Sequence, residues 1–220
     1  MNYSFHWLPA LRALPDMLRG SLVTLEIALL SMILGVSIAV LLALASRSRL
    51  KSVRAFVSTW VELARNTPAL FQIYMAYFGL GSLGIHLDSL PALLLGITFN
   101  NAGYLAETFR GGLIAVPATQ GLAARSLGMG AVQAFRLVVM PQMFRAVFHP
   151  MTNQMIWAIL MTSLGVVVGL NNDLTGVTQD LNVKSFRTFE YFAVAAVLYY
   201  AIAKIVTGLA RLMAWRLFRY

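Results

Sequence analysis

Long apolar stretches, separated by short charged ones, make up most of this chain. Residues 27–46 and 146–172 contain no charged side chain, and only Lys204 interrupts the stretch from Tyr191 to Ala210. A helix that crosses the hydrocarbon core of a bilayer needs about 20 mostly apolar residues. We therefore predict an all-α membrane protein with about five transmembrane helices, at residues 27–46, 55–81, 91–114, 146–172 and 191–210.

The amino-acid composition leads to the same fold class. Hydrophobic residues make up 59% of the chain and charged residues 11%, whereas a soluble domain has about 45–50% apolar and about 25% charged residues. So few charges cannot cover a water-facing surface, which excludes a soluble fold and intrinsic disorder. The chain has no cysteine, and its three histidines lie far apart in the sequence. We therefore expect neither a metal site nor a cofactor.

The basic residues predict how the chain is oriented. The net charge is +9, and most of the 17 lysines and arginines lie at the ends of the apolar stretches. If the loop after the first span is cytoplasmic, Arg65 and Lys204 lie inside the membrane and the external side holds only Arg12, Arg19, Lys184 and Arg187. The other eleven cations are then cytoplasmic. The positive-inside rule therefore predicts an external N-terminus and a cytoplasmic C-terminus.

Two Glu-x-x-Arg pairs lie in or near the second and third predicted spans. Glu62 and Arg65 form one, and Glu107 and Arg110 form the other. Residues three apart share a helix face, so each pair is expected to neutralise itself in part. A charge at the centre of a bilayer costs about 2.5–3.5 kcal/mol on insertion scales, so such residues normally face protein or water. The pairs are either structural ion pairs near the cytoplasmic helix ends or the lining of a translocation path or gate.

The predicted cytoplasmic loop at residues 117–145 is too long for a simple turn. Residues 120–127 are expected to form a short helix that exposes Ala123 and Ala124. Gly128 and Gly130 should break this helix, and residues 131–140 should form a second, amphipathic one. Pro141 is expected to block its continuation and to redirect the chain toward the membrane.

The residue spacing in this loop resembles that of a known family. Leu122-Ala123-Ala124 is followed after three residues by Gly128, and after nine more by Val138-x-Met140-Pro141. The same spacing occurs in the inner-membrane permease subunits of binding-protein-dependent ABC importers, with Glu, Ile and Leu at the positions of Leu122, Val138 and Met140. The resemblance implies a type I ABC importer transmembrane domain. It also implies that the loop contains coupling helices that dock on an ATPase subunit.

Further blocks narrow the resemblance to the polar amino acid permeases. They include Glu62-Leu-Ala-Arg65-Asn-Thr67-Pro68 with Gln72, and Asn100-Asn101 with Glu107 and Arg110. Asn153-Gln154 and Thr162-Ser163 continue the match, although Leu160-Met161 stand where the family often has Lys and a polar or acidic residue. The match implies an external, periplasmic segment at residues 1–19, a transmembrane domain at residues 20–215 and a cytoplasmic tail at residues 216–220. It places the protein in the bacterial inner membrane.

The chemistry of concentrative uptake predicts partner chains. None of the three lysines follows a glycine, so the chain has no P-loop for ATP. An ATPase subunit dimer must then bind the nucleotide, and a periplasmic solute-binding protein is implied by the family. Five helices do not readily enclose a pathway, so we also expect a second permease subunit, identical or homologous. The polar residues expected at membrane depth either bond helices together or line the path: Thr67, Pro68 and Gln72; Asn100 and Asn101; Asn153, Gln154, Thr162 and Ser163.

Two other classes of function are weighed against this one. An ion-gradient-driven secondary transporter or channel would need intramembrane carboxylates, for which Glu62 and Glu107 are the only candidates. An intramembrane enzyme would need a Ser/His or paired-carboxylate arrangement at membrane depth, which the sequence does not supply. The polar segment at residues 171–190 either contacts a binding protein or is a solvated loop.

Overall fold

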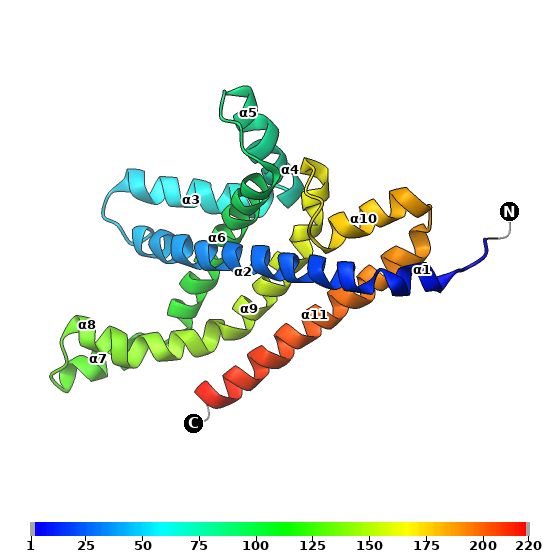
Figure 1. The fold of residues 1–220 in the computed structure, drawn as a ribbon. Helices are drawn as coiled ribbons and strands as arrows, with labels where there is room; N and C mark the ends of the chain where they lie inside the picture. The colour runs from blue at the N-terminus through cyan, green and yellow to red at the C-terminus, as the bar shows by residue number, and fades with distance from the viewer. Residues whose placement is uncertain (1–2, 219–220) are drawn as a thin grey trace.

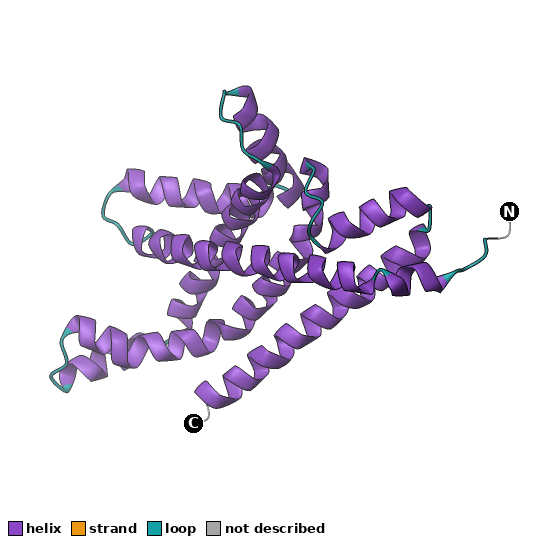
Figure 2. Cartoon of the chain, in the orientation of Figure 1, coloured by secondary structure: helices purple, strands orange, loops and turns teal. Residues whose placement is uncertain are grey.

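The computed structural model describes residues 3–218, and within this range all regular secondary structure is helical (Figure 2). Most helices are α-helices, η1 and η2 are π-helical, and η3 is a 3₁₀-helix. In chain order they are α1 (Trp7–Arg12), α2 (Leu14–Ala45), α3 (Lys51–Asn66), α4 (Ala69–Tyr74), η1 (Met75–Gly79), α5 (Leu80–Ser82), α6 (Ser89–Ala115), α7 (Ala118–Ser126), α8 (Ala131–Ala134), η2 (Phe135–Val139), α9 (Met140–Met161), η3 (Thr162–Val168), α10 (Leu174–Ser185) and α11 (Thr188–Leu217).

Helices α2, α6 and α9 form the centre of the bundle. Helix α6 packs against both α2 and α9, and it also contacts α3 and α4. Helix α11 packs along α9, and α10 packs against α2 and α11. Helices α4, η1 and α5 turn away from α2 and project from the bundle with the first part of α6 (Figure 1).

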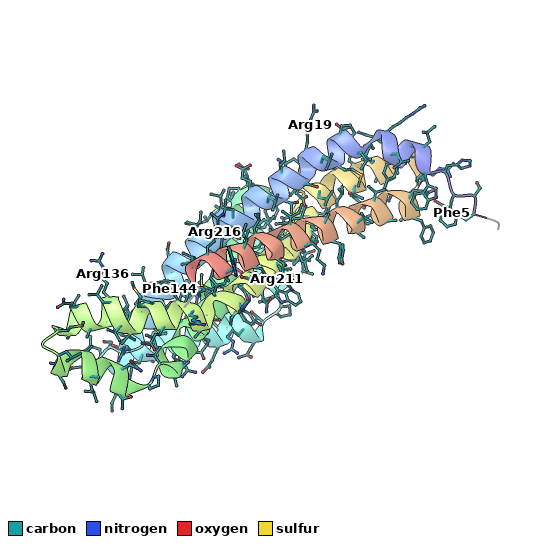
Figure 3. The ribbon with its side chains drawn as sticks, turned by 90° about the horizontal axis from the view of Figure 1, so that it is seen from below. Phe5, Arg19, Arg136, Phe144, Arg211 and Arg216 are labelled. Carbon is teal, nitrogen blue, oxygen red and sulfur yellow. The ribbon has the colours of Figure 1, made fainter. Side chains whose placement is uncertain are left out.

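The two ends of the bundle differ in what they carry. The C-terminal end of α2, the start of α3 and the hairpin of α7 and α8 lie toward one end, and α11 runs toward it (Figure 1). Helix α1, the far end of α10 and the start of α11 lie toward the other. In the view from below, Arg136 lies toward the end with α7 and α8, whereas Phe5 lies at the opposite end (Figure 3). We call these the α7 end and the N-terminal end.

Small residues let the central helices approach closely. A Cβ atom added at Gly103 would lie 2.3 Å from the Cβ of Ala64, and one added at Gly112 would lie 2.2 Å from Cγ1 of Val147. Apolar burial does not drive helices together in lipid, so close backbone contacts of this kind are a main source of packing energy there. The glycines of α6 therefore set its distance from α3 and α9.

The apolar spans are confirmed in part. Within residues 3–218, three helical stretches are long and apolar enough to cross a membrane: Leu14–Ala45, Ala131–Val168 and Thr188–Leu217. They contain nearly all of the first predicted span, most of the fourth and the whole of the fifth. The predicted stretch 91–114 lies within α6, but the stretch 55–81 is divided because α3 ends at Asn66 and α4 begins at Ala69. The count of five and the orientation stay predictions.

The prediction that Pro141 ends a helix is wrong. Helices α8, η2 and α9 follow one another without a break, and Pro141 lies in the first turn of α9. A proline ring inside an α-helix clashes with the carbonyl four residues earlier. Here the π-helical turn at Phe135–Val139 precedes the proline, and its wider turn accommodates the ring. The helix therefore runs on from the loop toward the centre of the bundle.

Candidate functional site

The break between α3 and α4 creates an unpaired carbonyl that side chains satisfy. Pro68 has no N–H group, so the carbonyl of Ala64 loses its helical partner. The side-chain amide of Gln72 donates to this carbonyl at 3.0 Å, and that of Asn100 donates at 3.1 Å. Backbone groups at membrane depth must be satisfied within the protein. The two amides therefore let the chain break here at little cost.

These groups form one cluster, which we call the α3–α6 junction: buried Gln72 and Asn100, half-buried Thr67 and exposed Pro68, with the Ala64 carbonyl. Gln72 also donates to Oγ1 of Thr67 at 2.9 Å and accepts a hydrogen bond from Asn100 at 3.1 Å. Only 7% of Gln72 and 6% of Asn100 are exposed. Residues predicted separately from two spans are thus brought together.

A second buried contact joins the three central helices. Gln154 of α9 donates to Oδ1 of Asn101 on α6 at 2.9 Å, and Nδ2 of Asn101 lies 3.4 Å from Oγ of Ser31 on α2. Asn101 and Ser31 are fully buried. The sequence analysis missed Ser31, whose only signal was a small polar residue in the middle of a charge-free span. We call this group the Asn101 junction.

The remaining polar candidates on α9 and η3 do not join either junction. Thr162 donates to the carbonyl of Ile159 at 2.8 Å, and Ser163 donates to that of Leu160 at 2.7 Å. Both bonds stay within their own helical segment. Asn153 is exposed.

The charged pairs behave differently from each other. Arg110 makes two hydrogen bonds to Glu107, at 2.9 and 2.7 Å, so this predicted pair is confirmed. The expectation that Glu62 and Arg65 neutralise each other is wrong. Glu62 instead accepts a hydrogen bond from Ser58 at 3.1 Å, whereas Arg65 lies 3.7 Å from Glu107. Arg65 faces α6, where the carboxylate of Glu107 is within reach.

The loop at residues 117–145 forms the tip of the α7 end. Helix α7 ends at Ser126, and Gly128 follows its C-cap residue with a φ of +87°, which suits a residue without a Cβ atom. The N–H of Met129 bonds to the carbonyl of Ala124, and that of Gly128 to the carbonyl of Arg125. This is the Schellman arrangement of a helix C-terminus. The predicted break at Gly128 is therefore confirmed.

The tip exposes several large apolar side chains. Leu122 is 62% exposed, Leu127 82% and Val132 80%. Ala123 is exposed as predicted, but Ala124 is buried, so the expectation that both alanines are exposed is wrong. The reason is that α7 folds back against η2, and only the outer side of the short helix remains free.

The N-terminal end is held by two buried acidic residues. Glu190 is fully buried and accepts hydrogen bonds from the hydroxyl of Tyr3 and from the backbone N–H of His6. Asp173 caps α10 by accepting from the N–H groups of Thr175 and Gly176. Burial raises the pKa of the Asp173 carboxyl, although the two backbone hydrogen bonds oppose this rise. Neither residue was predicted from the sequence. Glu190 bonds to a segment more than 180 positions away, whereas the cap made by Asp173 is local, and its sequence signal is an aspartate just before a helix.

These features define an all-helical, membrane-embedded transport component. Its central helices are joined by buried amides, and its exposed apolar tip extends from the bundle. The chain belongs to the family of binding-protein-dependent transport system inner membrane components, whose family model matches residues 13–219. It is therefore the permease component of such a system, rather than an enzyme.

Individual relatives agree with this family. The chain is 34% identical over 210 residues to the octopine transport system permease protein OccM of Rhizobium radiobacter, covering 91% of this chain and 85% of the relative. It is 32% identical over 186 residues to the probable glutamine ABC transporter permease protein GlnP of Bacillus subtilis, covering 83% of this chain and 85% of the relative.

Solved structures share the fold. A crystal structure of an amino acid ABC transporter with histidines matches with a TM-score of 0.90 at 28% identity, covering 97% of this chain and 100% of that one. The MetNI methionine ABC transporter in an inward-facing conformation matches with a TM-score of 0.76 at 18% identity, covering 94% of this chain and 98% of that one. The type I ABC importer fold predicted from the loop spacing is confirmed.

Proposed function

We propose that this permease carries polar amino acids into the cell, driven by ATP hydrolysis on a separate ATPase dimer. The observation that carries the proposal is the exposed apolar tip, on a chain whose relatives include proteins named as probable amino-acid and glutamine ABC transporter permeases. A single chain has no reason to expose Leu127 and Val132 to water unless a partner covers them. The tip is the proposed docking site of the ATPase.

The proposed orientation follows from the charges and the fold together. The α7 end carries the cationic start of α3 and the basic last turn of α11. We assign this end to the cytoplasm of a bacterial inner membrane and the N-terminal end to the periplasm. A solute-binding protein then delivers the amino acid to the periplasmic side, where residues 171–190 lie.

The tip is mechanically continuous with the polar junctions. Helices α8, η2 and α9 form one helical run from the tip to Gln154, and α6 leads from the Asn101 junction back to α7. Movement of the tip when ATP binds to the partner would therefore shift α6 and α9 relative to α2. In the proposed mechanism this shift switches the path between outward and inward access.

The path itself is proposed to lie between this chain and a second permease subunit, identical or homologous. Three groups are its candidate lining. The first is the α3–α6 junction together with the Asn101 junction, and the second is Asn153, Thr162 and Ser163. The third is the charged group of Glu62, Arg65, Glu107 and Arg110. A secondary transporter driven by an ion gradient gains no support, because Glu107 is already paired with two arginines. No residue of the chain is proposed to bind a cofactor.

Reconstituted transport tests the proposal. The complete complex of permeases, ATPase and binding protein is placed in liposomes, and uptake of labelled amino acids is measured with ATP inside. We expect uptake with ATP alone and none with a proton or sodium gradient alone. Ala123→Asp should abolish both uptake and co-purification of the ATPase. Ser52→Asp, at an exposed position on the first turn of α3, is the matched control and should change neither.

Uptake driven by an ion gradient without ATP would contradict the proposal. So would an Ala123→Asp complex that retains the ATPase and full transport. A complex that transports sugars but no amino acid would contradict the substrate class alone.

A further inference from the structure

Two adjoining cavities lie at the α7 end of the bundle. The first has a volume of about 530 Å³ and lies between the ends of α2 and α6, the start of α7 and η2. The second has a volume of about 380 Å³ and lies between the end of α2, α3 and α6. Ser46 and Arg110 line both, so the two cavities are neighbours, and we call them together the Arg47–Arg110 cavity.

The polar lining of this cavity has an excess of positive charge. Four arginines and two glutamates line it: Arg47, Arg54, Arg65 and Arg110, with Glu62 and Glu107. The carboxylate of Glu107 is shared between Arg110 and Arg65, so it cannot neutralise both. Within residues 3–218 no side-chain hydrogen bond or ion pair engages Arg47, which is exposed. Arg47 is therefore available to bind an anion in this cavity.

Another part of the cavity lining is apolar. Leu113, Ile114 and Val116 from the end of α6 line it together with Phe135 and Val139 of η2. Ile114 is 69% exposed in spite of its large apolar side chain. A free inorganic anion would gain nothing from such a wall. A molecule with both an anionic group and a hydrocarbon chain would contact both the arginines and the apolar residues of the lining.

The position along the helices points to the same chemistry. The cavity lies at the C-terminal ends of α2 and α6, where a long apolar helix gives way to Arg47 and its basic neighbours. In the proposed orientation these helix ends reach the cytoplasmic face, where lipid headgroups meet acyl chains. Basic pockets between membrane helices are suited to lipid headgroups.

We propose that the Arg47–Arg110 cavity binds one anionic phospholipid. Its phosphodiester lies between Arg47 and Arg110, and the first part of an acyl chain lies against Ile114 and Phe135. Because α7 and η2 also line the cavity, the bound lipid stabilises the position of the tip relative to α2 and α6.

Native mass spectrometry of the purified full-length chain tests the site. The chain is titrated with phosphatidylglycerol and with phosphatidylcholine of identical acyl chains. We expect phosphatidylglycerol to bind about fivefold more tightly or better, since each arginine near an anionic lipid contributes about 1 kcal/mol. Arg47→Gln should weaken phosphatidylglycerol binding about fivefold for the same reason. Arg216→Gln, on the last turn of α11 (Figure 3), is the matched control and should change binding less than about twofold.

Two further measurements distinguish a site for a lipid from a site for free phosphate. Ile114→Asn removes part of the apolar wall and should weaken phosphatidylglycerol binding while Arg47 is intact. Inorganic phosphate at millimolar concentration should leave the lipid bound. Size-exclusion profiles and circular dichroism establish that each variant is folded. If Arg47→Gln does not fold, Arg110→Gln replaces it with the same expected loss.

Three results would overturn the proposal. The first is equal affinity for the two lipids. The second is an equal loss of affinity in Arg47→Gln and Arg216→Gln, which would indicate unspecific attraction to the whole basic end. The third is displacement of the lipid by inorganic phosphate together with unchanged binding by Ile114→Asn, which would indicate a site for a free anion.

Discussion

The polar junctions and the exposed tip differ in whether their bonding requirements are met within one chain. At the α3–α6 junction, two side-chain amides satisfy the carbonyl that Pro68 leaves unpaired. At the tip, Leu127 and Val132 remain more than three-quarters exposed. The junctions are thus complete in a single subunit. The tip has a regular backbone, but its apolar side chains are not covered within the chain, as expected of a docking element.

This difference separates two kinds of constraint. A substitution in the junctions acts on the stability of the chain itself, because buried polar groups lose their partners. A substitution at the tip acts on assembly, because its side chains contact little within the chain. We therefore expect changes at the tip to reduce transport without reducing stability, and changes in the packed and bonded interior to reduce stability.

Leu127→Asp is expected to uncouple the permease from its ATPase. Leu127 is 82% exposed, and a charge placed at the centre of a docked apolar surface costs several kcal/mol of binding. ATP-driven uptake by the reconstituted complex should fall at least about tenfold. The unfolding free energy of the isolated chain should change by less than about 0.5 kcal/mol. Equal uptake by Leu127→Asp and the native protein would remove the tip from the docking surface.

Two neighbouring glycines of α6 test the close packing of the central helices. A Cβ atom at Gly112 would lie 2.2 Å from Val147, whereas one at Gly111 meets nothing within 4 Å. Gly112→Ala should therefore destabilise the chain by about 1–3 kcal/mol through overpacking. Gly111→Ala should stabilise it by up to about 1 kcal/mol, since alanine favours helix. Unfolding in a denaturing detergent, followed by circular dichroism, measures both; similar values would contradict the packing model.

The α3–α6 junction should lose stability when either amide is removed. Gln72→Leu and Asn100→Leu are each expected to cost about 0.6–2 kcal/mol. The double variant should cost less than the sum, because the two side chains share the Ala64 carbonyl and bond to each other. Gln142→Leu is the control, since exposed Gln142 bonds only to the carbonyl of Val138 in its own helical run. Strict additivity would show that the two amides act separately.

Asp173 predicts a weak dependence of stability on pH. Burial raises the pKa of its carboxyl in the folded chain, so the native state binds the proton more tightly than the unfolded state. This residue's contribution to stability is therefore full below the unfolded pKa of about 3.9 and falls as the pH rises through the folded pKa. Asp173→Asn keeps an oxygen that can cap α10 and should remove this slope. At neutral pH its stability should be equal or slightly higher; a large loss there would mean that the carboxylate charge is required.

The membrane class and the place of the coupling loop could be predicted from the sequence because both depend on local quantities. Hydropathy summed over a window identifies an apolar helix without knowledge of its neighbours. Gly128 ends α7 because its own backbone conformation requires a glycine. The Glu107 and Arg110 pair is equally local, since three residues along a helix bring the two side chains together.

Partners between helices could not be predicted in the same way. Arg65 bonds across to Glu107 rather than to Glu62, and Ser31 meets Asn101 although 70 positions separate them. The first contact depends on the close approach of α3 and α6 that Gly103 allows, and the second on that of α2 and α6 that Gly35 allows. The π-helical turn before Pro141 likewise reflects the path that α9 takes through the bundle.

The sequence by itself determined that this protein lies in a membrane, which segments are apolar enough to enter it and where its loop bends. Those properties follow from free energies of transfer and backbone preferences, which each residue carries wherever it is placed. Only the tertiary structure decided which amide satisfies which carbonyl, which alanine of the tip is covered and which arginines surround a common cavity. Those depend on distances between helices, and such distances arise only when the side chains of distant segments pack together.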